Sequence, residues 1–165
     1  MRINHFWARL VTLFVVLVVS MPAWSKYTPE QVKAVYLYRI ATFIQWEQES
    51  AMNRINICVV DDAEIQKILV QITRGKQVRN KPLNITDADC DVLYISERSN
   101  LNLLTSLPKG TVTIGGMEQF TNNGGAIELV EKQGKIKPKV NLENITGYQL
   151  SSNFLRVSEI EGGKQ

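Results

Sequence analysis

The sequence has almost no histidine: the single copy among 165 residues is His5, which lies in an N-terminal segment that we expect to be removed. A mature chain without imidazole lacks the usual Ser-His or Cys-His activation of a nucleophile and the commonest metal ligand. The glycine pairs at 115–116 and 124–125 do not have the spacing of a phosphate or dinucleotide loop. The acids at 87, 89 and 91 resemble the start of a calcium loop, but Val92 stands where that loop needs glycine. We therefore expect a protein that is not an enzyme, carries no cofactor or metal, and acts by binding.

Cysteine is also scarce, since Cys58 and Cys90 are the only two copies. In an exported chain an even pair is more often bridged than free. The alternative is a pair of small buried hydrophobic residues. A bridge would close a loop of about thirty residues and stabilise the fold by roughly 3.5 kcal/mol in the chain-entropy treatment.

The first 25 residues have the parts of a signal peptide. A positive start, an apolar run and small residues before a cut follow one another: Arg2 with Arg9, residues 10–19, and residues 23–25. A retained membrane anchor is the alternative, but Ser20 and Pro22 interrupt the run before the roughly 20 apolar residues that a bilayer span needs. We expect export, a mature chain that begins at Lys26, and no membrane-spanning segment after cleavage.

Neither sign of charge is in large excess. The chain has 19 basic and 16 acidic residues, and the loss of residues 1–25 removes two arginines and no acid. The mature chain is then close to neutral with both signs interspersed, whereas a nucleic-acid footprint needs clustered basic residues. We therefore expect no nucleic-acid partner. Residues 26–165 contain no repeat, linker or low-complexity block, which suits one domain with one core.

Strand and helix patterns alternate through the first part of the mature chain. A capping box from Thr28 to Gln31, with proline at the first helical position, predicts a helix that runs to about Trp46. Ser99 is expected to cap a later short helix. The remaining predicted elements are a strand over 55–60, an acid-capped helix that stops near residue 75, and strands over 77–86, 91–96 and 111–114. This alternation predicts an α/β fold with a mostly parallel sheet flanked by helices.

The last part of the chain has a different pattern. Residues 126–131 and 135–142 flank a short turn, which predicts an antiparallel hairpin at the edge of the same sheet. A short helix over 151–157 and a frayed tail from residue 161 are expected to follow. The predicted fold is a single α/β domain whose mixed, mostly parallel sheet is flanked by helices and ends in a C-terminal antiparallel hairpin.

The first predicted helix carries more apolar side chains than one buried stripe needs. Its Tyr38 and Trp46 are amphipathic aromatic residues, the kind that is enriched at interfaces. Together with Phe154 of the closing helix, they are our candidate partner-binding residues. The alternative is that this helix is buried on a broad face and that the three rings belong to the core.

Several segments, taken in order along the chain, resemble the YfiR family. They are the helix over 32–46 with its lysine-alanine start and closing tryptophan, the strand 57–60, the turn at 75–76, the cysteine-led strand 90–95, the hairpin segments 124–127 and 139–142, and the closing helix 150–155. The resemblance covers nearly the whole mature chain.

The resemblance implies an α/β periplasmic domain that often dimerises. It implies repression of an inner-membrane diguanylate cyclase through the enzyme's periplasmic region, which lowers cyclic di-GMP signalling and biofilm formation, and sequestration of the repressor by an OmpA-like outer-membrane lipoprotein. Cys58 and Cys90 fall where the family has a bridging pair. The second cysteine pair that some members carry near the terminal hairpin is missing, which puts redox control by that route in doubt. The alternative function is a periplasmic small-ligand-binding or accessory protein for a histidine kinase or transporter.

Overall fold

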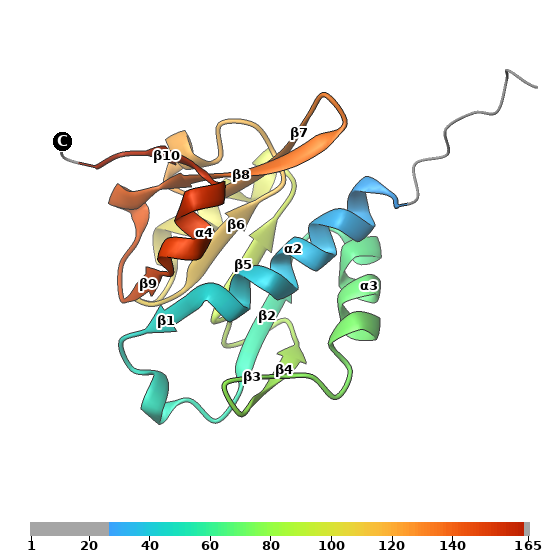
Figure 1. Cartoon of the computed structure of the whole chain (residues 1–165), viewed down its shortest axis with the longest axis vertical. Helices are drawn as coiled ribbons and strands as arrows, with labels where there is room; N and C mark the ends of the chain where they lie inside the picture. Colours follow the sequence, from blue (N-terminus) through green and yellow to red (C-terminus); the bar gives the residue numbers. More distant parts are fainter. Residues whose placement is uncertain (1–26, 164–165) are drawn as a thin grey trace, which may run out of the picture.

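The computed structural model describes residues 27–163, so the expected signal peptide over residues 1–25 lies outside the described residues. Its elements, labelled as in Figure 1, are α2 (Pro29–Phe43), β1 (Ile44–Trp46), η1 (Glu49–Ala51), β2 (Ile55–Val59), α3 (Ala63–Thr73), β3 (Gln77–Val78), β4 (Lys81–Ile85), β5 (Val92–Ile95), η2 (Arg98–Ser106), β6 (Val112–Gly115), η3 (Thr121–Asn123), β7 (Ile127–Lys132), β8 (Lys135–Asn141), η4 (Leu142–Asn144), β9 (Tyr148–Leu150), α4 (Ser152–Val157) and β10 (Glu159–Glu161).

Within the described residues, eight strands form the main sheet, in the order β10-β8-β7-β6-β5-β2-β4-β3. Five neighbouring strands in this order, β7, β6, β5, β2 and β4, are parallel to one another. Their spatial order is that of a doubly wound sheet whose switch point lies between β2 and β5. The β7–β8 hairpin adds an antiparallel strand, and both turn residues, Gln133 and Gly134, have positive φ. The arrangement confirms the predicted fold class.

The first helix begins where the sequence predicts and ends earlier. Thr28 Oγ1 accepts the N–H of Gln31 at 3.2 Å, and Gln31 Oε1 accepts the N–H of Thr28 at 3.0 Å, which completes the capping box. The expected end at about Trp46 is wrong, because α2 ends at Phe43. Ile44–Trp46 forms β1 and pairs with β9, more than a hundred residues further along the chain. This long-range pairing takes the three residues out of the helix.

Two other segments differ from the prediction. Arg98–Ser106 is the 3₁₀ helix η2, and Glu97 rather than Ser99 occupies its N-cap position, without a side-chain cap. Glu159–Glu161 forms β10, which pairs in parallel with β8, whereas the sequence predicts a frayed tail from residue 161. An ion pair of 2.8 Å between Lys139 Nζ and Glu161 Oε1 holds this strand, and the lysine lowers the pKa of the Glu161 carboxyl.

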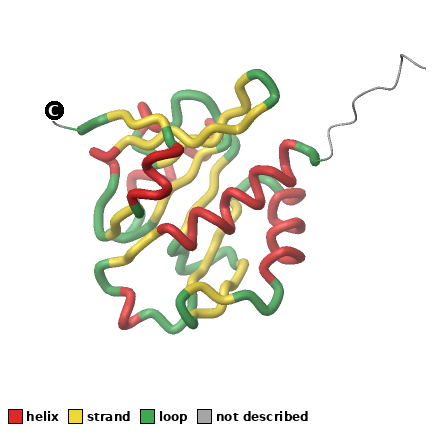
Figure 2. The backbone as a smooth tube through the Cα atoms, in the orientation of Figure 1, coloured by secondary structure: helices red, strands yellow, loops and turns green. Residues whose placement is uncertain are grey.

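The sheet has an apolar core on each face. The larger core lies beneath α2, α3 and α4; Figure 1 and Figure 2 show α2 and α4 in front of the strands and α3 at their side. The smaller core lies on the opposite face and contains Cys58, Leu93 and Ile95, with Leu101 and Leu104 of η2 packed against it. A disulfide joins Cys58 on β2 to Cys90 just before β5, which confirms the predicted bridge.

Candidate functional site

An apolar groove of about 780 Å³ runs between α2, α3 and α4. Figure 1 shows α2 between the other two helices, and both contact it. The groove is lined mainly by aliphatic and aromatic side chains, with a few polar ones: Tyr27, Gln31, Val32, Val35, Tyr36, Arg39, Ile40, Phe43, Ile68, Gln71, Ile72, Phe154 and Val157. Its volume lies within the range of roughly 300–1,000 Å³ that is usual for binding sites.

The groove exists because α2 is apolar on more than the face that it turns to the sheet. Ala34, Leu37, Ile40 and Ala41 are buried and belong to the core. Residues spaced four apart along another face of the same helix, from position 31 through 35 and 39 to 43, line the groove instead. These four positions span about 18 Å along the helix axis, at 1.5 Å per residue.

Two rings form part of the groove floor, and two valines remain accessible. Phe43 of α2 stacks on Phe154 of α4, with ring centroids 5.9 Å apart. Phe154 is 2% exposed, whereas Val35 is 44% exposed and Val157 is 60% exposed. Apolar surface that is left accessible in a concave site is typical of an interaction surface.

Of the described residues that line the groove, Arg39 is the only charged one, and none is acidic. Among the described residues, no hydrogen-bond or ion-pair partner contacts the Arg39 guanidinium, which is exposed. By contrast, Tyr36 uses its hydroxyl to donate to the backbone oxygen of Ile136 on β8, at 3.1 Å. The groove therefore combines apolar walls with one unpaired positive charge.

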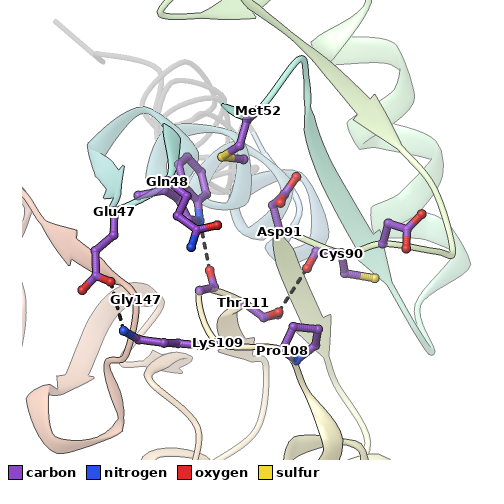
Figure 3. A pocket seen from close by; sticks show the side chains of 12 residues that line it. Glu47, Gln48, Met52, Cys90, Asp91, Pro108, Lys109, Thr111 and Gly147 are labelled. Atoms are coloured by element: carbon purple, nitrogen blue, oxygen red, sulfur yellow. Dashed lines mark hydrogen bonds and ion pairs between the residues drawn. The ribbon is translucent and has the colours of Figure 1, made fainter. Parts of the chain in front are cut away.

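A second, smaller hollow of about 340 Å³ lies beside the disulfide and is polar (Figure 3). Lys109 Nζ lies 3.0 Å from Glu47 Oε2 at its rim. Trp46 Nε1 donates to the backbone oxygen of Gly110 at 3.0 Å. Burial raises the pKa of the Asp91 carboxyl, which also lines this hollow. Its polar groups are thus largely engaged with one another.

Comparison with known families identifies the family of this chain. The profile of the YfiR/HmsC-like family matches residues 30–159, which is most of the chain and extends from the first turn of α2 past the end of α4. The chain belongs to the YfiR/HmsC-like family. No curated protein matches the sequence. The family is periplasmic and regulatory, and a disulfide such as the one between Cys58 and Cys90 suits that compartment.

This YfiR/HmsC-like chain places the three predicted partner-binding residues at different sites. Phe154 lies on the groove floor, where it is nearly fully buried. Trp46 is 8% exposed and lines the polar hollow. Tyr38 is half-buried, with Lys76 Nζ 5.9 Å above its ring, and does not line the groove. Trp46 and Phe154 belong to the larger core, so their role in contacting a partner stays a prediction.

Sequence reasoning missed three exposed residues of the groove. Val35, Arg39 and Val157 line the groove and are exposed, yet only the surplus of apolar residues on the first helix pointed toward this surface. The spacing of Val35 and Arg39, four residues apart, could have placed them on one face of α2. Val157 could not be placed, because its position depends on how α4 packs.

The crevice at the carboxyl ends of β2 and β5, where doubly wound sheets commonly bind ligands, is occupied by a side chain of this protein. Asp61 Oδ1 accepts the backbone N–H and hydroxyl of Ser96 at 2.7 and 2.9 Å. Its Oδ2 accepts the N–H of Glu97 and the Nδ2 of Asn100, each at 2.8 Å. Burial opposes ionisation, but these hydrogen bonds outweigh it and lower the pKa of Asp61.

Two further observations concern the described residues only. Over residues 27–163, no helix is both long enough and apolar enough to span a bilayer. Within the same range, no three histidine, cysteine, aspartate or glutamate side chains are grouped so that they could hold a metal ion.

Proposed function

We propose that this protein is a non-enzymatic repressor of an inner-membrane diguanylate cyclase, and that it binds the periplasmic region of the enzyme through the groove between α2, α3 and α4. The family match supports a periplasmic regulatory role and is the observation that carries the proposal. The groove supports a protein contact, since it leaves Val35 and Val157 accessible beside the stacked rings of Phe43 and Phe154.

Repression through this surface requires only differential binding. The protein shifts the cyclase toward its inactive state by as much as it prefers that state. A shift from 99% active to 99% inactive needs a preference of about 10⁴-fold, or roughly 5.5 kcal/mol. Interfaces concentrate about 2 kcal/mol or more in each of a few anchors. Three side chains that enter the groove only in the inactive state of the cyclase would therefore suffice.

The family resemblance supports two further partners. An OmpA-like outer-membrane lipoprotein would relieve repression by sequestering the protein, because a molecule bound to the lipoprotein is withdrawn from the cyclase. A second copy would form the dimer that is common in the family.

Deletion of the gene in a host that expresses the neighbouring cyclase tests the proposal. Cyclic di-GMP and biofilm matrix should rise, and the wild-type gene should restore both. Val157→Glu places a charge at the groove and should fail to restore them. The matched control is Val70→Glu: Val70 is an exposed valine on α3 that does not line the groove, so this variant should restore both.

Two outcomes would contradict the proposal in different ways. An unchanged cyclic di-GMP level after deletion would refute repression and favour the alternative of an accessory protein for a histidine kinase or transporter. Full repression by Val157→Glu would leave the function standing and remove the groove as the contact. Equal melting temperatures of the two variants ensure that neither result reflects unfolding.

A further inference from the structure

We propose that the groove between α2, α3 and α4 is also a binding site for a small anionic amphiphile, a molecule with one carboxylate or equivalent anion and an apolar body. The anion would pair with Arg39, and the body would cover Val35, Phe43 and Val157. The site itself does not depend on the function proposed above. Only its regulatory consequence, competition with the cyclase, rests on that function.

The charge distribution of the groove selects an anion. Arg39 is its single charged lining residue, and no described residue pairs with the guanidinium. A guanidinium stays protonated and offers a planar fork of N–H donors that matches a carboxylate. A cationic amphiphile would meet an unpaired like charge, and a neutral one would leave that donor fork without an ionised acceptor.

The shape of the groove selects an apolar body of limited size. Its volume of about 780 Å³ fits one small molecule. The lining positions 35, 39 and 43 follow one another at intervals of four residues, so Arg39 has an apolar neighbour on each side along the helix. A carboxylate at Arg39 therefore leaves its attached chain over valine in one direction and over the Phe43–Phe154 stack in the other.

The same charge argues against a second copy as the occupant. A two-fold symmetric contact would place the same patch on both copies. Each copy would then bring Arg39 to the interface without an acidic lining residue to face it. An anion from outside the protein removes this conflict.

The test uses protein purified from the periplasmic fraction and four probes below their micelle-forming concentrations: dodecanoate, 1-dodecanol, dodecyltrimethylammonium and acetate. Calorimetric titration should show saturable one-to-one binding of dodecanoate. Dodecanol should bind about fivefold more weakly, the upper end for a solvent-accessible ion pair. The cation should bind more weakly than dodecanol, and acetate should not bind, because it lacks the apolar body.

Variants assign the binding to the groove. Arg39→Gln should weaken dodecanoate about fivefold, to the level of dodecanol, and leave dodecanol itself unchanged. Val35→Glu should weaken the binding of dodecanoate at least tenfold, because the new carboxylate lies beside Arg39 and carries the same charge as the ligand. Val70→Glu is matched, since Val70 and Val35 are both 44% exposed and only Val35 lines the groove. This control should bind dodecanoate as the wild type does.

The outcomes separate the ligand from other occupants and from the proposed function. Equal affinities for dodecanoate, dodecanol and the cation would overturn the proposal, as would unchanged dodecanoate binding by both Arg39→Gln and Val35→Glu. Binding of an acidic amphipathic peptide without binding of dodecanoate would assign the groove to a helix instead. Binding of dodecanoate that leaves the complex with the cyclase's periplasmic region intact supports the ligand site and removes the groove as the cyclase contact.

Discussion

Removal of the Cys58–Cys90 bridge is expected to lower the free energy of unfolding by about 3.5 kcal/mol. The two cysteines are 32 positions apart, and closing a loop of that length restricts the unfolded chain by roughly this amount. Replacing both with alanine should cost about 1 kcal/mol more, because Cys58 is 3% exposed in the smaller core and loses a buried sulfur. Reduction of the wild type removes the bridge and keeps both sulfur atoms. The reduced protein therefore isolates the loop contribution.

The assay compares guanidinium unfolding of the oxidised wild type, the reduced wild type and the Cys58→Ala/Cys90→Ala variant, followed by circular dichroism. The denaturant concentration at the midpoint should be highest for the oxidised wild type, lower for the reduced wild type and lowest for the variant. The free energy of unfolding should depend more steeply on guanidinium concentration without the bridge, because the unconstrained unfolded chain exposes more surface. Thiol labelling of the denatured protein should be negligible until reductant is added.

The reasoning is refuted if the oxidised and reduced proteins unfold at the same midpoint, or if both thiols label fully before reduction. One further result follows from the fold. Cys58 lies in the core on the face opposite to α2, α3 and α4. Reduction should therefore leave the groove intact, and the affinity of the folded protein for a groove ligand should stay constant.

Three other variants test separate parts of the structure. Phe154→Ala should destabilise the fold by about 3–5 kcal/mol in thermal unfolding, because this ring is 2% exposed and stacks on Phe43; a change below about 1 kcal/mol would place it outside the core. Gly147→Ala should cost about 2 kcal/mol or more in urea unfolding, since Gly147 has φ +79 and an added Cβ would lie 2.8 Å from the Gly110 nitrogen; wild-type stability would contradict this close approach. Folding lowers the pKa of the Asp61 carboxyl from 3.8, so the stabilisation by this group is present above pH 3.8 and is lost as the pH falls through the folded-state pKa. Asp61→Asn should therefore lower the free energy of unfolding near pH 7 and flatten the acid side of its dependence on pH. An unchanged pH dependence would contradict that linkage.

The parts of the fold that could be predicted from sequence depend on nearby residues. The start of α2 follows from Thr28 and Gln31, which are three positions apart and hydrogen-bond to each other. The β7–β8 turn follows from the two residues between its strands, and the start of α4 follows from Ser151, whose side chain accepts the N–H of Phe154. In each case the deciding contact spans only a few residues. Local chemistry is sufficient there.

The errors arise where distant segments decide the outcome. Ile44–Trp46 continues the helical pattern of the first helix, but these residues pair with Tyr148–Leu150. The short β10 depends on the partner strand and on Lys139, which lies more than twenty positions before Glu161. The groove is of the same kind, because Val157 reaches it only when α4 packs on α2. Apolar surplus on the first helix could be predicted from sequence, but the residues that stay accessible could not.

The switch point of the sheet differs from the groove in how far its polar groups are already engaged within the chain. At the switch point between β2 and β5, Asp61 already takes the hydrogen bonds of Ser96, Glu97 and Asn100, and the hydroxyl of Tyr94 on β5 is buried. In the helical layer, α2 has 15 residues and α3 has 11, but α4 has only six. A helix that short leaves part of α2 uncovered, including Val35 and the guanidinium of Arg39, which has no partner among residues 27–163. Accessible, unsatisfied surface is therefore found on the helices and not at the strand ends, and recognition by this protein is expected there.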